Sequence, residues 1–473
     1  MAAPLWTFAD LAAAASGSCD GVAPAEVAGF SIDTRSIQPG EVFVALTDQR
    51  DGHAFVTSAF KAGAAIAIVR GEYARQPGDG ALLRVDDPLR ALEHIGIAAR
   101  TRLDAKARIV AVTGSAGKTG TKEMLRVALA TAGRTHAAIK SFNNHWGVPL
   151  TLASMPADTM FGVFEIGMNH AGEITPLTRF VRPHVAVITN VLPVHIGNFP
   201  DGEAGVAAAK AEIFAGLEPA GIAIIPEDSE YVTRLRAHVP AGRRIVTFGT
   251  GAGADVRAGA LEPADAGTSV EVLLGGRTIS YRCGLPGLHI AVNSLAVVAV
   301  LDALGVPLAA ALAPLAGLAP PDGRGARSRV ALPSGTATLI DESYNANPAS
   351  MRAALAVLVA SVPKRAGRRI AVLGDMRELG KSGPELHRAL IDAIDGRPID
   401  QVFTCGLLMR NLFEVLPPQQ RAAWSDTSTG LIAALLAGLR DGDVIMVKGS
   451  LGTNMAPIVA ELKKRGAAAS ATL

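Results

Sequence analysis

Short apolar runs rich in β-branched residues alternate along this chain with longer stretches in which apolar positions recur at helical spacing. The first clear run covers residues 42–46, and it is followed by a helical stretch over 51–63 and a second run over 64–69. Runs of this kind predict buried strands, and the periodic stretches predict helices. A further helical stretch over 92–107 leads out of this first α/β unit.

The same alternation continues in the middle of the chain. Apolar runs at 109–112, 161–166, 185–191, 221–225 and 244–248 are separated by helical stretches. Strands that alternate with helices predict a mostly parallel sheet, which binds ligands at the carboxyl ends of its strands. Residues 256–287 differ, because short β-prone segments joined by glycine turns predict antiparallel ribbons.

Composition narrows the class of protein. A chain of 473 residues predicts two or three domains, and 45 basic against 43 acidic residues give no field that favours nucleic acid or anionic lipid. An aromatic content of 4% argues against stacking platforms for single strands. Cys19, Cys283 and Cys405 have neither metal-ligand spacing nor a disulfide framework, which suits a reducing compartment.

Two segments bear on the membrane. The N-terminus has no basic region before its alanine-rich stretch, so no signal peptide is predicted. The longest uncharged run, 303–321, is interrupted by glycine and proline, which predicts a helix, a turn and a linker. We therefore expect a cytoplasmic protein with no membrane insertion and no nucleic-acid partner.

A glycine-containing loop lies between the strand predicted at 109–112 and a helix with apolar positions from Met124 onward. In that context, backbone N–H groups turn toward an anion, a lysine reaches the β/γ-phosphates and a hydroxyl suits Mg²⁺. The complete P-loop signature would have glycine where Val112 stands, and a plain strand-to-helix turn is the alternative. The predicted phosphate loop comprises Thr113, Gly114, Ser115, Ala116, Gly117, Lys118, Thr119 and Gly120.

Polar residues follow the apolar strands of the central region. Glu165 ends one strand, His195 follows the next, and Lys210 lies in a helix of small residues. A carboxylate and a hydroxyl are ligands that Mg²⁺ prefers, so Thr119 and Glu165 form a candidate pair. For Glu165 the alternative is a structural carboxylate, for His195 a loop histidine, and for Lys210 a solvated helix lysine.

The first unit carries a polar segment, residues 31–36, before the apolar run at 42–46. Its hydroxyls and the guanidinium of Arg35 match phosphate oxygens, and a solvated turn is at least as good an interpretation.

Three further segments, 141–150, 341–348 and 372–380, complete a pattern that resembles the ATP-dependent Mur ligases of peptidoglycan synthesis. The resemblance extends from about Ser31 to about Met455. It implies an α/β protein of three domains: a small α/β UDP-sugar domain at 1–105, a central P-loop ATPase-like domain with a mostly parallel sheet at 106–317, and a doubly wound Rossmann-like domain at 318–473. The third domain is expected to close on the nucleotide and bind the incoming dipeptide.

The resemblance also implies a reaction. ATP phosphorylates the terminal carboxylate of UDP-MurNAc-tripeptide, and the amine of D-Ala-D-Ala attacks the acyl phosphate. The implied cofactors are ATP and two Mg²⁺ ions, and a monomer is expected. The alternatives are a sister ligase that adds a single amino acid, a folylpolyglutamate-type or cyanophycin-type ligase, and a nucleotide-binding module that is not a ligase.

Site roles follow from matching positions in the family pattern. The substrate residues are Ser31, Asp33, Thr34, Arg35, Ser36, Asn143, Asn144, His145, Asn345 and Asn347. The catalytic residues are Lys118, His195, Lys210 and Arg324, and the metal ligands are Thr119, Glu165, His195 and carbamylated Lys210. Further ATP contacts are expected from His289, Asn293, Arg324, Asp341 and Tyr344. The chain departs from the pattern at Ile290, Glu342, Leu451 and residues 226–229, which leaves the adenine contacts and the C-terminal loop open.

Overall fold

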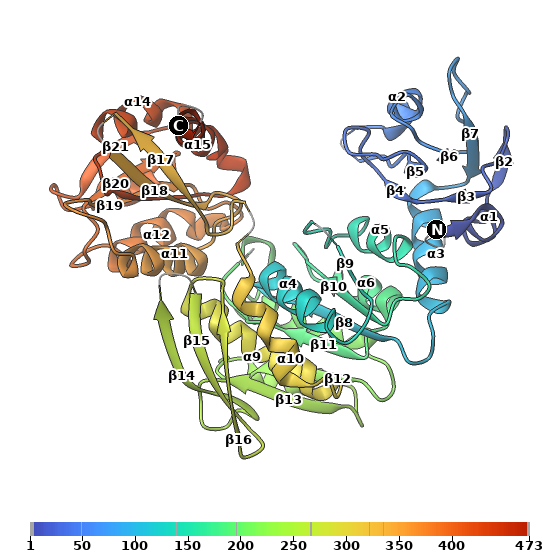
Figure 1. Cartoon of the computed structure of the whole chain (residues 1–473), viewed down its shortest axis with the longest axis horizontal. Helices are drawn as coiled ribbons and strands as arrows, with labels where there is room; N and C mark the ends of the chain where they lie inside the picture. Colours follow the sequence, from blue (N-terminus) through green and yellow to red (C-terminus); the bar gives the residue numbers. More distant parts are fainter. Residues whose placement is uncertain are drawn as a thin grey trace.

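A computed structural model describes residues 4–48, 50–138, 140–194, 196–264, 267–320, 322–333 and 335–470. These residues form three α/β units in chain order, each built around a sheet of its own (Figure 1). The N-terminal unit, blue in Figure 1, and the C-terminal unit, orange to red, stand on opposite sides of the central unit's upper edge. Within the described ranges, no helix has both the length and the apolar character needed to cross a membrane.

The N-terminal unit contains a five-stranded sheet in the order β2-β7-β6-β5-β4, parallel except where β2 pairs with β7. Its elements are β1 (Trp6–Thr7), α1 (Phe8–Ala15), β2 (Ser18–Asp20), β3 (Glu26–Val27), β4 (Gly29–Ser31), β5 (Glu41–Val44), η1 (Gly52–Phe55), α2 (Val56–Lys61), β6 (Ile66–Arg70), β7 (Ala81–Val85) and α3 (Pro88–Thr101). The stretch predicted as one helix over 51–63 is a 3-10 turn followed by a short α-helix. The turn forms because the Asp51 carboxylate accepts the His53 N–H at 3.1 Å.

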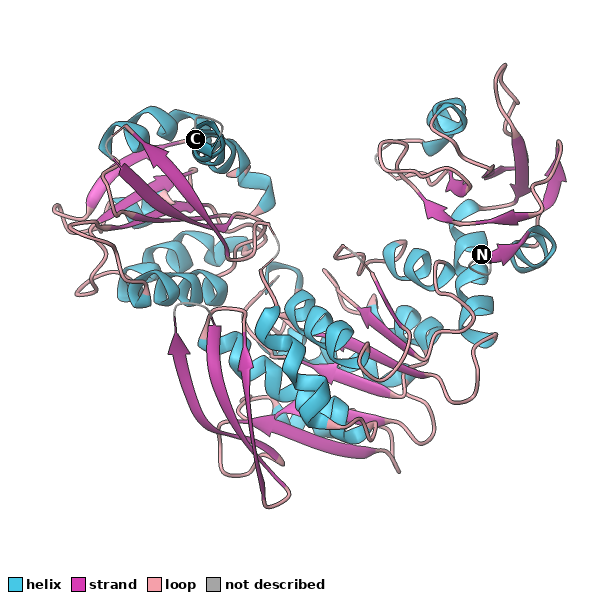
Figure 2. Ribbon diagram, viewed as in Figure 1, coloured by secondary structure: helices cyan, strands magenta, loops and turns pink. Residues whose placement is uncertain are grey.

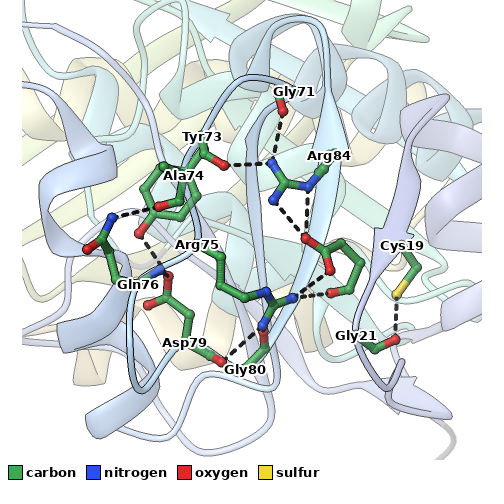
Figure 3. A network of polar contacts seen from close by, with 11 residues as sticks. Cys19, Gly21, Gly71, Tyr73, Ala74, Arg75, Gln76, Asp79, Gly80 and Arg84 are labelled. Atoms are coloured by element: carbon green, nitrogen blue, oxygen red, sulfur yellow. Dashed lines mark hydrogen bonds and ion pairs between the residues drawn. The ribbon is translucent and has the colours of Figure 1, made fainter.

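A dense polar network closes the β2 edge of this sheet (Figure 3). The Asp20 carboxylate accepts two N–H groups of Arg84, at 3.0 and 2.7 Å, and pairs with Arg75 at 3.0 Å. Arg84 also donates to the carbonyls of Gly71 and Tyr73. These bonds hold the loop before β7 against β2, so each arginine ends on a carboxylate or a backbone carbonyl of its own unit.

The central unit contains a nine-stranded sheet in the order β16-β15-β14-β13-β12-β11-β8-β10-β9. Its strands are β8 (Arg108–Thr113), β9 (Thr135–Ala137), β10 (Phe161–Glu165), β11 (Val185–Ile188), β12 (Ile222–Pro226), β13 (Arg244–Gly249), β14 (Val256–Ala264), β15 (Gly267–Leu274) and β16 (Arg277–Cys283). Its helices are α4 (Lys118–Leu129), α5 (Gly147–Ala153), α6 (Ile174–Val181), η2 (Ile196–Asn198), α7 (Glu203–Ala211), η3 (Glu212–Gly216), α8 (Val232–Ala237), α9 (Leu288–Ala303), α10 (Leu308–Leu312) and η4 (Ala313–Gly317).

Burial on both faces explains the continuous apolar run of β8. Val110 and Val112 face the layer formed by α4 and α9, whereas Ile109 and Ala111 face the core formed with α5, α6 and α7. A parallel strand covered by helices on both sides needs apolar residues at every position. The antiparallel ribbons expected over 256–287 are confirmed as β14, β15 and β16, and they extend the same sheet through a parallel contact with β13.

The C-terminal unit contains a six-stranded sheet in the order β17-β18-β22-β19-β20-β21, parallel except for the hairpin of β17 and β18. Helices pack on both of its faces (Figure 2), α11 and α13 on one and α14 and α15 on the other. Its elements are β17 (Ala326–Leu332), β18 (Gly335–Glu342), α11 (Pro348–Ala360), β19 (Arg369–Gly374), η5 (Gly380–Ser382), α12 (Gly383–Arg388), η6 (Ala389–Ala393), β20 (Gln401–Cys405), α13 (Arg410–Phe413), β21 (Arg421–Ser425), α14 (Ser428–Gly438), β22 (Val444–Lys448), η7 (Leu451–Thr453) and α15 (Ala456–Ser470). The predicted fold class of three α/β domains is confirmed, and the predicted boundaries stay predictions.

Candidate active site

The loop between β8 and α4 has the geometry of a phosphate cradle. Gly114 and Gly117 have φ angles of +147° and +82°, and Gly117 is the N-cap of α4. A Cβ at Gly114 would lie 1.9 Å from Thr189 Oγ1, and one at Gly117 would lie 2.0 Å from Asn293 Nδ2, so both positions require glycine. The positive end of α4 therefore faces the same space as the loop's backbone.

Neighbouring strands hold the loop in place. Asn190, which follows β11, accepts the Ala116 N–H on its side-chain oxygen at 2.8 Å and donates to the Ala116 carbonyl at 3.0 Å. Ser115 and Leu192 exchange two further hydrogen bonds. Lys118 folds back and donates to the Gly114 carbonyl at 2.6 Å. The cradle is thus fixed in shape without a ligand.

A buried hydroxyl and a buried carboxylate meet beside the loop. Thr119 Oγ1 donates to Glu165 Oε2 at 2.9 Å, and Asn143 Nδ2 donates to Glu165 Oε1 at 2.7 Å. The two meet because β10 runs parallel to β8 with Glu165 level with Val112. These are hard oxygen donors that fit Mg²⁺. Among the described residues, no group of three or more His, Cys, Asp or Glu is arranged to hold a metal ion.

The C-terminal unit brings a second group of polar side chains to this place. Arg324 donates to Ser141 Oγ at 3.0 Å, and its guanidinium lies 4.1 Å from the centre of the Tyr344 ring. Lys448, at the end of β22, is only 3% exposed and donates to the Asn345 carbonyl at 2.9 Å and to Glu342 at 3.2 Å. Both cations line the same cavity as the glycine loop.

A cavity of about 1820 Å³ joins these groups. Its wall includes the phosphate loop from Ser115 to Gly120 and residues of α3, α9 and α11. The volume exceeds that of a drug-sized ligand pocket and suits more than one substrate. Burial in this cavity lowers the pKa of Lys118. The charge of Glu165 raises this pKa, and the charge of Arg324 lowers it. Such a site favours anionic ligands.

Comparison with known proteins agrees with this geometry. Residues 112–301 match the model of the Mur ligase middle domain, and residues 327–451 match that of the Mur ligase glutamate ligase domain. The UDP-N-acetylmuramoyl-tripeptide–D-alanyl-D-alanine ligase of Bacillus subtilis is 33% identical over 92% of this chain and 93% of its own length, and that of Escherichia coli is 34% identical over the same shares. The chain belongs to the Mur ligase family.

Solved structures agree. A crystal structure of MurF from Acinetobacter baumannii superposes with a TM-score of 0.83 at 30% identity, and the match covers 98% of this chain and all of the other. The similarity therefore includes all three units. The predicted resemblance to the Mur ligases is confirmed.

Most predicted site residues of this Mur ligase come together in the cavity. Those that line it are Ser115, Ala116, Gly117, Lys118, Thr119, Gly120, Asn143, Asn144, His145, Glu165, His289, Asn293, Arg324, Tyr344, Asn345 and Asn347. Asn347 has a second task, since its side chain caps α11 by accepting the Ser350 N–H at 2.8 Å. Their proximity supports the predicted roles, which stay predictions.

Other predicted residues lie elsewhere. Thr113 and Gly114 are buried behind the loop surface, and Asp341 is held by Ser343 and Lys463. The polar loop of residues 31–36 does not line the cavity; Asp33 accepts two N–H groups of Arg35, which lowers the pKa of Asp33 to about 2. This loop belongs to the N-terminal unit.

Of the two residues predicted to bind a second metal ion, Lys210 and His195, the structure describes only Lys210. Lys210 is 2% exposed in α7, and its burial, together with the positive charge of Lys118, sets the pKa of its amine well below the usual value. A solvated helix lysine, the alternative interpretation, is therefore excluded. His195 lies outside the described residues.

Two polar residues with contacts described above, Lys448 and Ser141, line the cavity but were not among the predicted site residues. Lys448 stands at the end of the apolar run 444–447, a position that follows the same rule that selected Glu165. Ser141 carried no signal of its own, since its partners Thr119 and Arg324 are distant in sequence.

Proposed function

We propose that this chain is the ATP-dependent ligase that joins D-Ala-D-Ala to UDP-MurNAc-tripeptide and forms UDP-MurNAc-pentapeptide. The observation that supports this most directly is that Lys118 and Arg324, from different units, reach one cavity that also holds the Thr119–Glu165 pair. Cations that converge on a phosphate loop suit a reaction in which two anions, ATP and a carboxylate, must approach each other.

The reaction proceeds in two displacements. The terminal carboxylate oxygen of the tripeptide attacks the γ-phosphorus of ATP, ADP leaves, and an acyl phosphate forms. The amine nitrogen of D-Ala-D-Ala then attacks the acyl carbon, the nitrogen loses a proton, and inorganic phosphate leaves as the amide bond closes. Lys118 and Arg324 offset the negative charge that gathers on the transferred phosphoryl group.

Two Mg²⁺ ions bound at this place would screen the phosphate charges, with Thr119 and Glu165 holding one of them. For the second ion we propose Lys210 as a carbamate together with His195. Burial, and then the charge of Lys118, lowers the pKa of Lys210, which favours the uncharged amine, the form that reacts with carbon dioxide.

Each unit has a separate task in this proposal. Residues 1–105 bind the UDP-sugar, with Ser31, Asp33, Thr34, Arg35 and Ser36 near its diphosphate. Residues 106–317 bind ATP, with His289 and Asn293 near the adenine. Residues 318–473 close on the nucleotide and bind the dipeptide beside Tyr344, Asn345 and Asn347. We propose that the enzyme acts as a monomer in the cytoplasm.

The test is phosphate release from ATP by the purified chain with UDP-MurNAc-tripeptide, with and without D-Ala-D-Ala. Release that depends on the dipeptide, together with formation of the pentapeptide, is the expected result. Dependence on a single amino acid instead would assign the chain to a sister ligase. Nucleotide binding without release in the presence of any amine would identify a non-ligase module.

A further inference from the structure

Residues 140–145, between β9 and α5, contribute Lys140, Ser141, Asn143, Asn144 and His145 to the cavity wall. Before them, the chain is anchored by Lys122, a fully buried lysine of α4 that donates to the Ala138 carbonyl and pairs with Glu123 at 2.9 Å. After Ser141, the Gly167 N–H donates to the Asn143 carbonyl at 2.8 Å. Anchors on both sides fix the position of Ser141, which lies between them.

Ser141 links two units of the molecule. Its Oγ lies 2.9 Å from Thr119 Oγ1 and accepts an N–H of Arg324 at 3.0 Å. The direction of the first bond follows from chemistry: the single hydroxyl proton of Thr119 is given to Glu165, so Ser141 must donate to Thr119. Donation therefore runs one way, from the guanidinium through two hydroxyls to the carboxylate.

A one-way series of hydrogen bonds between a cation and an anion has two consequences. Each bond polarises the next, which strengthens the whole series inside a buried site. Each oxygen also uses a defined lone pair, so Thr119 keeps one lone pair free on the side away from Ser141. The position of Arg324 is thereby tied to the same threonine that faces the phosphates.

We propose that Ser141 is a positioning residue that holds Arg324 at the γ-phosphate of ATP. Arg324 comes from a separate unit, and its described contacts with the central unit include this single side-chain hydrogen bond across 183 positions of sequence. Without the hydroxyl of Ser141, the guanidinium of Arg324 keeps its stacking on Tyr344 but is no longer held in a fixed position relative to the phosphate loop. This inference rests on the proposed ligase function.

The test compares Ser141→Ala, Ser141→Thr and Arg324→Ala in the ligation assay. Loss of a hydrogen bond to a charged group predicts a decrease in kcat of about 10- to 100-fold for Ser141→Ala. The KM for ATP stays within about threefold, because the other expected ATP contacts are unchanged and Arg324 acts mainly on the phosphoryl group in transfer. Ser141→Thr, which keeps the hydroxyl, restores most of the rate.

A double-mutant cycle separates positioning from a general packing effect. If Ser141 acts through Arg324, Ser141→Ala changes kcat little in the Arg324→Ala background. Ser361→Ala is the matched control, since this serine also accepts an arginine N–H, from Arg327 at 3.1 Å, but does not line the cavity. Its kcat should equal that of the wild type.

Additive losses in the cycle, or a Ser141→Ala enzyme with wild-type kcat, would overturn the inference while leaving the ligase function intact. A wild-type protein that releases no phosphate in response to D-Ala-D-Ala would instead overturn the proposed function. The two failures are therefore distinguishable in one set of assays.

Discussion

Two polar networks in this molecule use arginine differently. In the N-terminal unit, Arg75 and Arg84 both bind the Asp20 carboxylate and also donate hydrogen bonds to backbone carbonyls (Figure 3). Beside the cavity, Arg324 meets a neutral hydroxyl and an aromatic ring. The first network satisfies its own charges, whereas the second leaves charge facing an open space.

The pKa values reflect the same contrast. Hydrogen bonds from Arg84 and Arg75 lower the pKa of Asp20, which means that the charged form of the carboxylate is stabilised. Burial, together with neighbouring positive charge, lowers the pKa of Lys118 and of Lys210, which means that their charged forms are destabilised. In the first network, the carboxylate of Asp20 balances the positive charges. In the second network, the positive charges need an anionic ligand to balance them. The first should therefore govern stability and the second activity.

The largest effect is expected in the cavity network, at the loop proposed to bind phosphate. Lys118→Ala removes the cation of the glycine loop, and ligation should fall by about 10²–10³-fold, as when a preorganised charge-stabilising donor is removed. Folding should be unaffected, since the lysine makes its described hydrogen bond to a single loop carbonyl. Ligation rate and circular dichroism measure the two quantities. Lys106→Ala, an exposed lysine outside the cavity, is the control, and an unfolded Lys118→Ala protein would contradict the assigned role.

A smaller effect is expected at Lys210. Its depressed pKa predicts a carbamate that is detected as a ¹³C signal after incubation with labelled bicarbonate. The signal should disappear in Lys210→Met, and ligation should fall by about 10- to 100-fold, as for other groups that orient a metal site. Acidification should remove the carbamate, since protonation of the amine prevents its formation. A Lys210→Met enzyme with the wild-type rate would limit this lysine to a packing role.

Local sequence rules predicted much of the site. A buried strand, a glycine loop and a helix predicted a phosphate loop at 113–120, of which residues 115–120 line the cavity, and the parallel rhythm of strands predicted Glu165 near Thr119. Both inferences rest on periodicities that extend over fewer than ten residues. The helix over 92–107 was misplaced by several residues, because its actual start is set by the cap of Asp87 and by Pro88.

Contacts between units were beyond such rules. Ser141 and Arg324 belong to different units and meet only where these units pack, and neither segment carries a periodic signal for that contact. The loop of residues 31–36 was a candidate from its hydroxyls and guanidinium, and the resemblance assigned it to the substrate, but neither predicted whether it would line the cavity. The family pattern thus supplied the candidate residues, and packing decided which of them meet.

In the network around Asp20, a substitution should change the stability of the protein rather than its activity. Arg84→Met breaks two bonds to Asp20 and two to backbone carbonyls, which should lower the free energy of unfolding by about 1–3 kcal/mol. Arg84→Lys keeps the charge but not the forked geometry, so it should fall between Met and the wild type. Urea unfolding measures the change, and kcat at a temperature where both variants are folded should match the wild type. A loss of kcat would show that the two networks are coupled.

The smallest effect is expected at His184, which lies beside the start of β8, at the far end of this strand from the phosphate loop. Its Nδ1 accepts the Ile109 N–H at 3.0 Å, which only the neutral ring can do. Burial, and then the charges of Arg100, Arg108 and Arg182, lower its pKa to about 4, against 6.5 in the unfolded chain. The stability from this contact is therefore complete above pH 6.5 and is lost as the pH falls toward 4.

His184→Asn offers an oxygen to the same N–H but does not titrate. The stability of the wild type relative to His184→Asn should thus decrease by about 1–2 kcal/mol between pH 7.5 and pH 5, as measured by urea unfolding at both values. Ligation by the two proteins should remain equal, because the ring lies at the far end of the strand from the loop. A constant difference in stability would mean that the histidine keeps one protonation state throughout. In that case the positive charge around it, unlike the charge in the cavity, has no consequence for proton binding.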